Sequence, residues 1–244
     1  MIFAAGLGTR LRPLTGHKPK ALVEVAGMPL LELAIRRLKL FGYDEILVNI
    51  HHFGQQIIDF LEERQHFGIH IRISDERSEL LDTGGGLKYG RDFFGNSPFL
   101  LYNTDVLSDI DLAALQEAHR RRGGLATLAV RARETSRYLL FDDELQLAGW
   151  RNEKDGAERW SRKPSQQAVP LAFSGIHMVE PALFDYFPTE RRVFSIIDTY
   201  LTAARSEAIY GYRHDDGLWL DVGKKPALEQ AASVLERIKI APAL

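Results

Sequence analysis

The sequence of 244 residues contains no cysteine, and this absence removes three kinds of chemistry at once. Without a thiol, the chain has no disulfide, no thiolate nucleophile and no cysteine-ligated zinc site. Long hydrophobic runs are missing as well, since no apolar stretch approaches the roughly 18 residues that a membrane-spanning helix needs. The short apolar run at the start has no basic segment before it, so the sequence predicts no secretory signal and a cytoplasmic location.

An excess of charge of one sign is also lacking. The 31 lysines and arginines face 33 aspartates and glutamates, which leaves a formal net charge of −2. No strong field draws such a chain to nucleic acid or to an anionic membrane, so we expect neither as a partner. What the sequence does contain, 45% hydrophobic and 26% charged residues, is ordinary for a globular protein. Its length predicts a single domain, 1–244, acting as a monomer or a homodimer.

The first half of the chain alternates strand-like with helix-like segments. Buried-strand patterns occupy 2–5, 45–50, 69–74 and 98–103, and helical spacing of apolar residues marks 29–41, 54–64 and 112–122. This alternation predicts an α/β fold with a Rossmann-like, doubly wound, mostly parallel sheet. Ligands in such folds bind beyond the carboxyl ends of the strands.

The second half has a different pattern. Strand-like segments at 127–132, 138–141, 145–150 and 170–179 lie close together, and helices are expected near 194–205 and 224–238. Strands this close together predict an antiparallel extension of the sheet. The pattern therefore divides the domain into a nucleotide-binding half of about 1–124 and a second half of about 125–244.

Glycine and positive charge crowd the exit of the first strand, in MIFAAGLGTRLRPLTGHKPKAL. Gly6 and Gly8 permit positive φ and let backbone N–H groups approach a ligand closely. Four cations stand within reach of the same point: Arg10, Arg12, Lys18 and Lys20. Together these features suit a polyphosphate.

Other interpretations of this stretch are weaker. A glycine turn with solvated basic residues is the plainest one. The dinucleotide fingerprint of an NAD(P) dehydrogenase, G-x-G-x-x-G, would need a glycine where Leu11 stands and a strand-ending acid about 20 residues on. A Walker A sequence, G-x-x-x-x-G-K-[ST], does not occur in the chain.

Two aspartates are candidate metal ligands. Asp105 follows a buried strand, and Asp221 follows Leu218-Trp219-Leu220, so both carboxylates are expected to emerge from apolar surroundings. Mg²⁺ typically takes one or two carboxylates and completes its octahedron with phosphate oxygens and water. Either aspartate alone could equally cap a loop, but together with the basic glycine loop they favour a Mg²⁺ site.

The stretch AAGLGTRLRPLT…KPKAL resembles the signature loop of the sugar-1-phosphate nucleotidyltransferases, G-x-G-T-R-L-x-P-L-T…x-P-K. NTD (103–105) and WLDVGKKP (219–226) extend the resemblance over nearly the whole chain. The resemblance implies a GT-A-like fold whose second half binds a sugar. It also implies Mg²⁺-dependent transfer of a nucleoside monophosphate from a triphosphate to a sugar 1-phosphate, with release of pyrophosphate.

The resemblance also assigns residues. Arg10, Lys20, Asp105 and Asp221 would be the catalytic set, with the two aspartates as the Mg²⁺ ligands. The nucleotide contacts carried over by motif position and by the glycine run described next are Ala5, Gly6, Gly8, Thr9, Arg10, Lys20, Asp82, Gly85, Gly86 and Asn103.

The stretch LLDTGGGLKYG (80–90) bears on the nucleotide. Three glycines between a strand and a helix predict a loop whose backbone lines a flat base or ribose. The form Asp82-Thr83-Gly84-Gly85-Gly86 resembles the N-acetylmuramate-1-phosphate uridylyltransferases, and this implies UTP and N-acetylmuramate 1-phosphate as substrates. Guanylyl or thymidylyl transfer to a mannose-, heptose- or glucose-type 1-phosphate stays open, as does a non-catalytic nucleotide-sugar sensor.

The sugar side departs from the family pattern F-V-E-K-P. Its features are split between GWRNEK (149–154) and SRKP (161–164), which puts either Asn152 or Arg162 where the family has glutamate. An arginine there would favour a sugar that carries its own carboxylate, such as a lactyl ether. The residues expected to contact the sugar phosphate are Asn152, Arg162, Lys163, Ser174 and Gly175.

Overall fold

A computed structural model describes residues 1–164 and 166–242 of the chain. It divides into two compact units, each built from segments that are distant in sequence. Unit 1 comprises Met1–Leu81, Tyr102–Ile110 and the segment from Gly217 onward, and unit 2 comprises Asp82–Leu101 and Asp111–Asp216. These bounds differ from the predicted halves, because local periodicity does not reveal which distant segments pack together.

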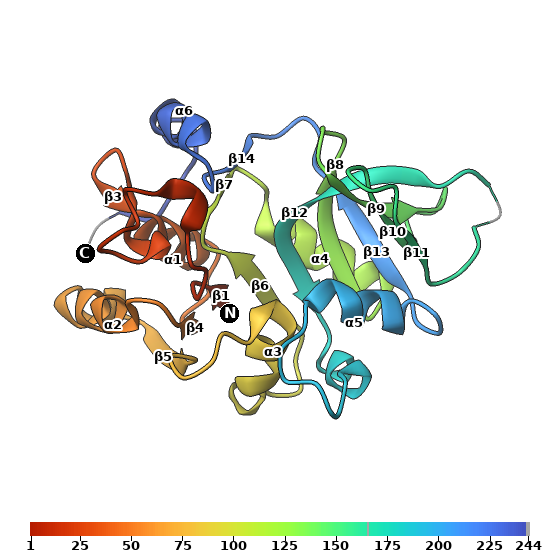
Figure 1. The fold of residues 1–244 in the computed structure, drawn as a ribbon, viewed down its shortest axis with the longest axis horizontal. Helices are drawn as coiled ribbons and strands as arrows, with labels where there is room; N and C mark the ends of the chain where they lie inside the picture. The colour runs from red at the N-terminus through yellow and green to blue at the C-terminus, as the bar shows by residue number, and fades with distance from the viewer. Residues whose placement is uncertain (165, 243–244) are drawn as a thin grey trace. The chain divides into compact units, whose positions relative to one another are not determined.

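Unit 1 contains the parallel sheet. β1 (Ile2–Phe3) pairs with β4 (Glu45–Ile50) on one side and with the end of β6 (Phe99–Asn103) on the other, and β4 pairs with β5 (His70–Asp75). All three pairings are parallel, as the sequence predicts. Figure 1 shows α1 (Leu30–Leu40) and α2 (Gly54–Glu63) beside these strands. The strand β4 is buried from Ile46 to Ile50, as parallel strands covered on both faces are.

Several short elements complete unit 1. They are the 3₁₀ turns η1 (Thr9–Leu11), η2 (Lys20–Leu22) and η3 (Gln65–Gly68), the pairs β2 (Glu24–Val25) with β3 (Met28–Pro29) and β7 (Val106–Ser108) with β14 (Trp219–Asp221), and α6 (Lys225–Leu235). Figure 1 shows α6 near β7 and β14. A buried cluster that includes Leu11, Leu107 and Val222 joins them. The glycine-rich loop and the start of α6 therefore share one apolar support.

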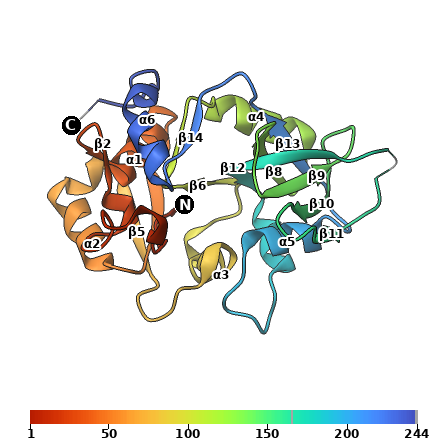
Figure 2. The same ribbon diagram turned by 45° about the horizontal axis from the view of Figure 1, so that its top comes forward.

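Unit 2 holds a second group of strands. Its strands are β8 (Ala126–Arg131), β9 (Arg137–Phe141), β10 (Leu147–Asn152), β11 (Glu158–Trp160), β12 (Val169–Val179) and β13 (Ile209–Arg213). Their order is β11-β10-β9-β12-β8-β13, and every pairing is antiparallel except that of β8 with β13. Figure 2 shows these strands between α4 (Leu112–Arg122) and α5 (Ile196–Ala203). The predicted antiparallel extension is confirmed.

The prediction of a loop at the glycine run is wrong, because residues Asp82–Tyr89 form a helix, α3. The N–H groups of Gly84 and Gly85 donate to the carbonyl oxygen of Phe194 at 2.9 and 3.1 Å. A Cβ on Gly84 would lie 2.4 Å from the Phe194 ring. The missing side chain lets α3 pack directly against the segment that leads into α5. The 3₁₀ turn η4 (Arg91–Phe93) follows α3, and η5 (Pro181–Tyr186) follows β12.

Most other bounds follow the sequence closely, with α4 at the predicted residues 112–122. β10 covers 147–152 instead of 145–150, since Leu145 has a φ of 58° and lies in a turn. The carboxylate of Asp142 closes that turn by accepting from the N–H of Gln146 at 2.8 Å. Within the described ranges, none of the helices has both the length and the apolar character needed to cross a membrane.

Candidate functional site

The ladder between β7 and β14 brings the two candidate aspartates together in unit 1. In its register, Asp221 lies opposite Val106, the residue that follows Asp105. The N–H of Val222 donates to the carbonyl oxygen of Asp105 at 2.8 Å and fixes the two chain segments at this point. Each aspartate therefore emerges beside the other, although one belongs to the middle of the sequence and the other to its last part.

The glycine loop is folded tightly at one glycine and open at the other. Gly8 has a φ of 63°, and a Cβ there would lie 2.9 Å from the Cβ of Lys20 and from the Cγ2 of Thr15. The hydroxyl of Thr15 donates to the carbonyl oxygen of Gly8 at 2.8 Å. Gly6, by contrast, has no atom within 4 Å of the place where a Cβ would lie. The backbone at Gly6 is thus accessible to a ligand, whereas Gly8 is needed for the fold of the loop.

Three residues of the predicted catalytic set surround a residue outside that set, Gly223. A Cβ on Gly223 would lie 2.6 Å from Asp221 Oδ1, 3.0 Å from Arg10 Nη2 and 3.2 Å from Lys20 Nζ. Lys20 also forms an ion pair with Asp105. The sequence did not single out Gly223, and the only signal for it was its place directly after Asp221-Val222 in the motif.

Charges in this cluster balance one another. Burial raises the pKa of Asp221 above its usual value, and the nearby charge of Asp105 raises it further, while Lys20 and Arg10 oppose the shift. The side chains of Lys20 and Asp105 are 14% and 20% exposed. Lys20, Asp105 and Asp221 thus share a partly desolvated space, where charge interactions are stronger than in water, and Arg10 is exposed beside them.

The donor set fits Mg²⁺. Among residues 1–164 and 166–242, no group of three or more histidine, aspartate or glutamate side chains could hold a metal ion by itself. The cluster offers two carboxylates, Asp105 and Asp221, which is the usual protein contribution to a Mg²⁺ site that is completed by phosphate oxygens and water.

A buried network that the sequence analysis missed supports the loop from behind. Asn49, at the end of β4, accepts the N–H of Ala4 at 2.7 Å and donates to Glu76 at 2.8 Å. The second carboxylate oxygen of Glu76 accepts the N–H of Leu81 at 3.4 Å, and His51 donates to the Glu76 carbonyl oxygen at 2.7 Å. Asn49 and Glu76 are 3% and 2% exposed. Polar residues directly after two buried strands were the available signal.

The remaining predicted residues of unit 1 lie around the same edge of the sheet. Ala5 is buried after β1, Thr9 is exposed at the start of η1, and Asn103 ends β6 opposite Phe3. The structure thus places all nine predicted residues of unit 1 on the glycine loop, on η2, directly after β1 or β6, or at the ends of β6 and β14.

The other predicted nucleotide contacts belong to unit 2. Asp82 is exposed and starts α3 with a φ of 61°, and its carboxylate accepts the N–H of Thr83 at 2.6 Å. Gly85 and Gly86 are buried within α3. The N–H of Gly85 donates to the carbonyl oxygen of Phe194, which also belongs to unit 2.

The predicted sugar contacts are divided among several local structures of unit 2. Asn152 donates to Asp155 at 2.7 Å within the turn between β10 and β11. Lys163 is exposed. Ser174 is fully buried on β12 and bonded to His214 Nε2 at 2.7 Å, and Gly175 has a φ of 76° where the register of β12 shifts.

The guanidinium of Arg162 is engaged within unit 2. Its guanidinium pairs with Asp142 at 2.6 Å and donates to the carbonyl oxygen of Leu147 at 3.1 Å. The same carboxylate closes the turn before β10. The guanidinium of Arg162 thus already has a carboxylate partner within unit 2, and its recognition of a carboxylate on the sugar stays a prediction.

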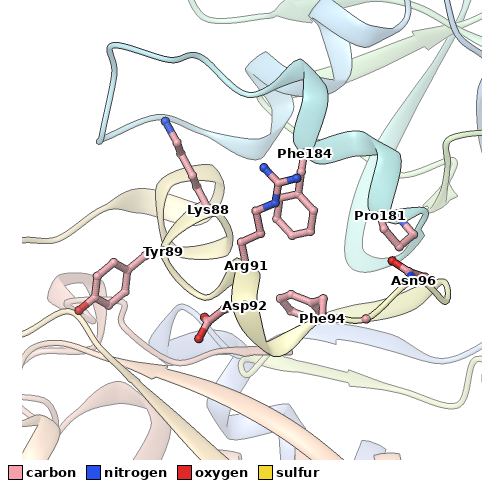
Figure 3. Close-up of a pocket in the computed structure, with 9 residues that line it drawn as sticks. Lys88, Tyr89, Arg91, Asp92, Phe94, Asn96, Pro181 and Phe184 are labelled. Carbon is pink, nitrogen blue, oxygen red and sulfur yellow. The ribbon is translucent and has the colours of Figure 1, made fainter.

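Unit 2 contains several cavities, and two of them have the size of a ligand site. One, of about 440 Å³, is lined by residues of β9, β10, β11 and β12, by the start of α5 and by the segment before β9. The other, of about 610 Å³, lies between the end of α3, η4 and η5. Figure 3 shows the second cavity, where Arg91 lies 5.0 Å from the ring centroid of Phe184. Lys88 there already donates to the carbonyl oxygen of Pro188 at 2.7 Å, so we assign this cavity no ligand.

Comparison with known proteins identifies a family and several relatives that are similar to this chain in sequence. A family model described as nucleotidyl transferase matches residues 1–237. The N-acetylmuramate α-1-phosphate uridylyltransferase of Neisseria meningitidis serogroup B is 33% identical over 241 residues, which cover 96% of each chain. The protein of the same name from Caulobacter vibrioides is 32% identical and covers 93% of this chain and 92% of its own.

A solved structure has the same fold. A UDP-glucose pyrophosphorylase complexed with UDP-glucose superposes with a TM-score of 0.78 at 17% identity, and the match covers 97% of both chains. The similarity of fold therefore extends over both units, as the family model does.

Proposed function

The chain belongs to the nucleotidyl transferase family and is a sugar-1-phosphate nucleotidyltransferase, and we propose that it transfers uridylyl from UTP to N-acetylmuramate 1-phosphate. In this reaction an oxygen of the sugar phosphate attacks the α-phosphorus of UTP, and pyrophosphate leaves. Two observations support the choice of substrates. The first is the Asp82-Thr83-Gly84-Gly85-Gly86 sequence, and the second is the likeness over nearly the full length to two enzymes of that name.

The observation that carries the proposal is a cluster in which Arg10, Lys20 and Asp221 surround Gly223 and Lys20 forms an ion pair with Asp105. The nucleophile of this reaction is already an anion, so the chemistry does not need a strong general base. The difficulty is to bring two anions together and to stabilise charge on the departing pyrophosphate. Positioning and electrostatic stabilisation account for most of the catalysis in phosphoryl-type transfers.

The residues of unit 1 supply what this chemistry needs. The open backbone at Gly6 and the guanidinium of Arg10 would bind the β- and γ-phosphates, and Lys20 would lie at the α-phosphate. Asp105 and Asp221 would hold Mg²⁺, which when bound supplies positive charge to the phosphate oxygens. Partial burial of Lys20, Asp105 and Asp221 strengthens the interactions of their charges, and Arg10 is exposed beside them.

A matrix of nucleoside triphosphates and sugar phosphates tests the proposal. Pyrophosphate release would be measured for UTP, GTP and dTTP, each with N-acetylmuramate, N-acetylglucosamine, mannose and glucose 1-phosphates. We expect the highest kcat/KM for UTP with N-acetylmuramate 1-phosphate. A higher value for GTP with mannose 1-phosphate, or for dTTP with glucose 1-phosphate, would replace the proposed substrates with those.

The Asp105→Asn variant serves as the matched control, because asparagine keeps the size of the side chain and removes its charge. This variant should lose turnover and should change the Mg²⁺ dependence of nucleotide binding while keeping its thermal stability. Tight binding of a nucleotide sugar without turnover in any combination would instead identify a sensor.

A further inference from the structure

The cavity of about 440 Å³ in unit 2 has the size of a small-molecule site. Ligand cavities usually measure about 300 to 1,000 Å³, and the lower part of this range suits a substituted monosaccharide. Trp150 on β10 and Phe173 on β12 line the cavity. These two strands also carry Asn152 and Ser174, the residues that the sequence predicts on the sugar side.

The floor of the cavity is apolar. Leu139 is 2% exposed, and the half-buried rings of Trp150 and Phe173 and the side chain of Ile197 complete it. Aromatic and aliphatic floors of this kind pack against the C–H faces of a sugar ring, while a few polar groups at the edge determine its orientation.

Positive charge dominates the edge of the cavity. Three arginines line it, Arg133, Arg137 and Arg159, against a single carboxylate, that of Asp198. Arg159 is fixed from two sides, since it pairs with Asp198 at 2.6 Å and lies 4.5 Å from the ring centroid of Trp150. Arg133 donates to the carbonyl oxygen of Phe173 at 3.0 Å. These two arginines are thus held by the wall of the cavity.

Arg137 differs from the other two. Its backbone N–H donates to the hydroxyl of Thr135 at 3.4 Å, and its guanidinium has no hydrogen bond or ion pair within the parts of the chain that the structure describes. It stands at the start of β9, where the pairing with Asn152 on β10 fixes its backbone. A rigid backbone with an unengaged guanidinium at a cavity edge is suited to binding an anion.

We propose that this cavity is a subsite for a sugar that carries its own carboxylate, and that Arg137 is the residue that recognises this carboxylate. The inference rests on the proposed function, since it takes the occupant of the cavity to be the sugar phosphate acceptor. The proposal assigns recognition of the carboxylate to Arg137, whereas the sequence analysis assigned it to Arg162. Arg137 forms no ion pair within the described part of the chain, whereas Arg162 pairs with Asp142. The guanidinium fork matches a carboxylate in a bidentate geometry, which an ammonium group cannot reproduce.

The test compares two acceptors that differ only in the lactyl ether, N-acetylmuramate 1-phosphate and N-acetylglucosamine 1-phosphate. Initial rates of pyrophosphate release with UTP would be measured for the full chain, for Arg137→Gln and for Arg137→Lys. Arg121→Gln is the matched control, because Arg121 is an exposed arginine on α4 of the same unit and lines neither cavity among the described residues.

Arg137→Gln should lower kcat/KM for the muramate acceptor about tenfold, since an exposed charge-assisted hydrogen bond contributes at the low end of its range. The same variant should leave the glucosamine acceptor within about twofold of the wild type. Arg137→Lys should give an intermediate loss for the muramate acceptor, and Arg121→Gln should change neither. An equal fall for both acceptors, or no change for either, would overturn the assignment.

A binding measurement separates this inference from the proposed function. If UTP gives no product with either acceptor, isothermal titration calorimetry with N-acetylmuramate and N-acetylglucosamine tests the subsite without turnover. Binding of N-acetylmuramate that weakens about tenfold in Arg137→Gln, with no change for N-acetylglucosamine, would support the subsite even then. Equal affinities of wild type and variant for N-acetylmuramate, or no binding of it to the wild type, would refute it.

Discussion

A single methyl group added at Gly223 should disable the site while leaving the fold intact. In Gly223→Ala the new Cβ would lie 2.6 Å from Asp221 Oδ1 and 3.0 Å from Arg10 Nη2. A carbon and an oxygen in ordinary van der Waals contact are about 3.3 Å apart, so the carboxylate must move by about 0.7 Å. Gly223 has no positive φ in the range that disfavours alanine, so the backbone itself accepts the substitution.

The size of the loss follows from this displacement. A shift of about 1 Å in a catalytic group can cost about 100-fold in rate, and a shift of 0.7 Å in Asp221 should approach that value. We expect kcat/KM for pyrophosphate release to fall by about 50- to 100-fold, or roughly 2.5 kcal/mol of transition-state stabilisation. The free energy of unfolding should change by less than about 1 kcal/mol, as the substitution adds a small side chain at a position with acceptable backbone angles.

Gly95→Ala provides the control for this experiment. Gly95 has no atom within 4 Å of the place where a Cβ would lie and no positive φ, so this variant should match the wild type in rate and stability. Steady-state rates and urea unfolding of the three proteins give all the numbers needed. A Gly223→Ala enzyme with the wild-type kcat/KM would refute the argument, because the four charged groups could not then be the ones that act on the nucleotide.

Three further results are expected. Gly8→Ala should lower the free energy of unfolding in urea by about 1–2 kcal/mol, because its φ is 63° and its Cβ would meet Lys20 and Thr15, whereas an unaltered midpoint would contradict the described loop. Glu76→Ala should destabilise the chain by about 2 kcal/mol, since it leaves the buried amide of Asn49 without its acceptor, and Glu76→Gln should lose less; equal losses in both would argue against this bond. Burial lowers the pKa of His177 from 6.5 in the unfolded chain to about 3 in the folded chain. Between pH 3 and pH 6.5 the unfolded chain therefore binds more protons than the folded chain. The contribution of neutral His177 to stability is complete above pH 6.5 and is lost as the pH falls toward 3. Urea unfolding at pH 7 and pH 5 should show a decrease of about 2 kcal/mol from this residue, which His177→Gln should lack.

The regular elements of the fold could be predicted because their signals are local. The apolar residues that predict β4 and the residues that cap α4 lie within or next to these elements in the sequence. Asp111, for example, accepts the N–H groups of Ala113 and Ala114 at the start of α4. The helix α3 could not be predicted in this way. Its glycines are explained by contact with Phe194, which belongs to a distant part of the sequence, and no local pattern announces that contact.

The candidate site likewise has features that local sequence predicts and features that depend on packing. Arg10, Lys20, Asp105 and Asp221 stand in motifs that a reader of the sequence can find, and the structure brings these four together. Arg162 also stands in such a motif, but its ion pair with Asp142 is a contact that only the folded chain shows. Residue type and spacing thus identify which groups are available, while the packing around each group determines whether it is free to bind a substrate.

The candidate site needs both cationic and anionic residues, because each kind compensates the charge of the other. Arg10 and Lys20 alone would repel each other, and so would Asp105 and Asp221, whose mutual repulsion contributes to the raised pKa of Asp221. Placed together, the two cations and the two carboxylates compensate one another before any substrate arrives, and the ion pair of Lys20 with Asp105 is one result. A phosphate alone would have to compete with the carboxylates for the cations, and a divalent ion alone would have to compete with the cations for the carboxylates. Binding the two together would satisfy both pairs at once, so we expect this arrangement of four residues to bind a metal–triphosphate complex more tightly than either component.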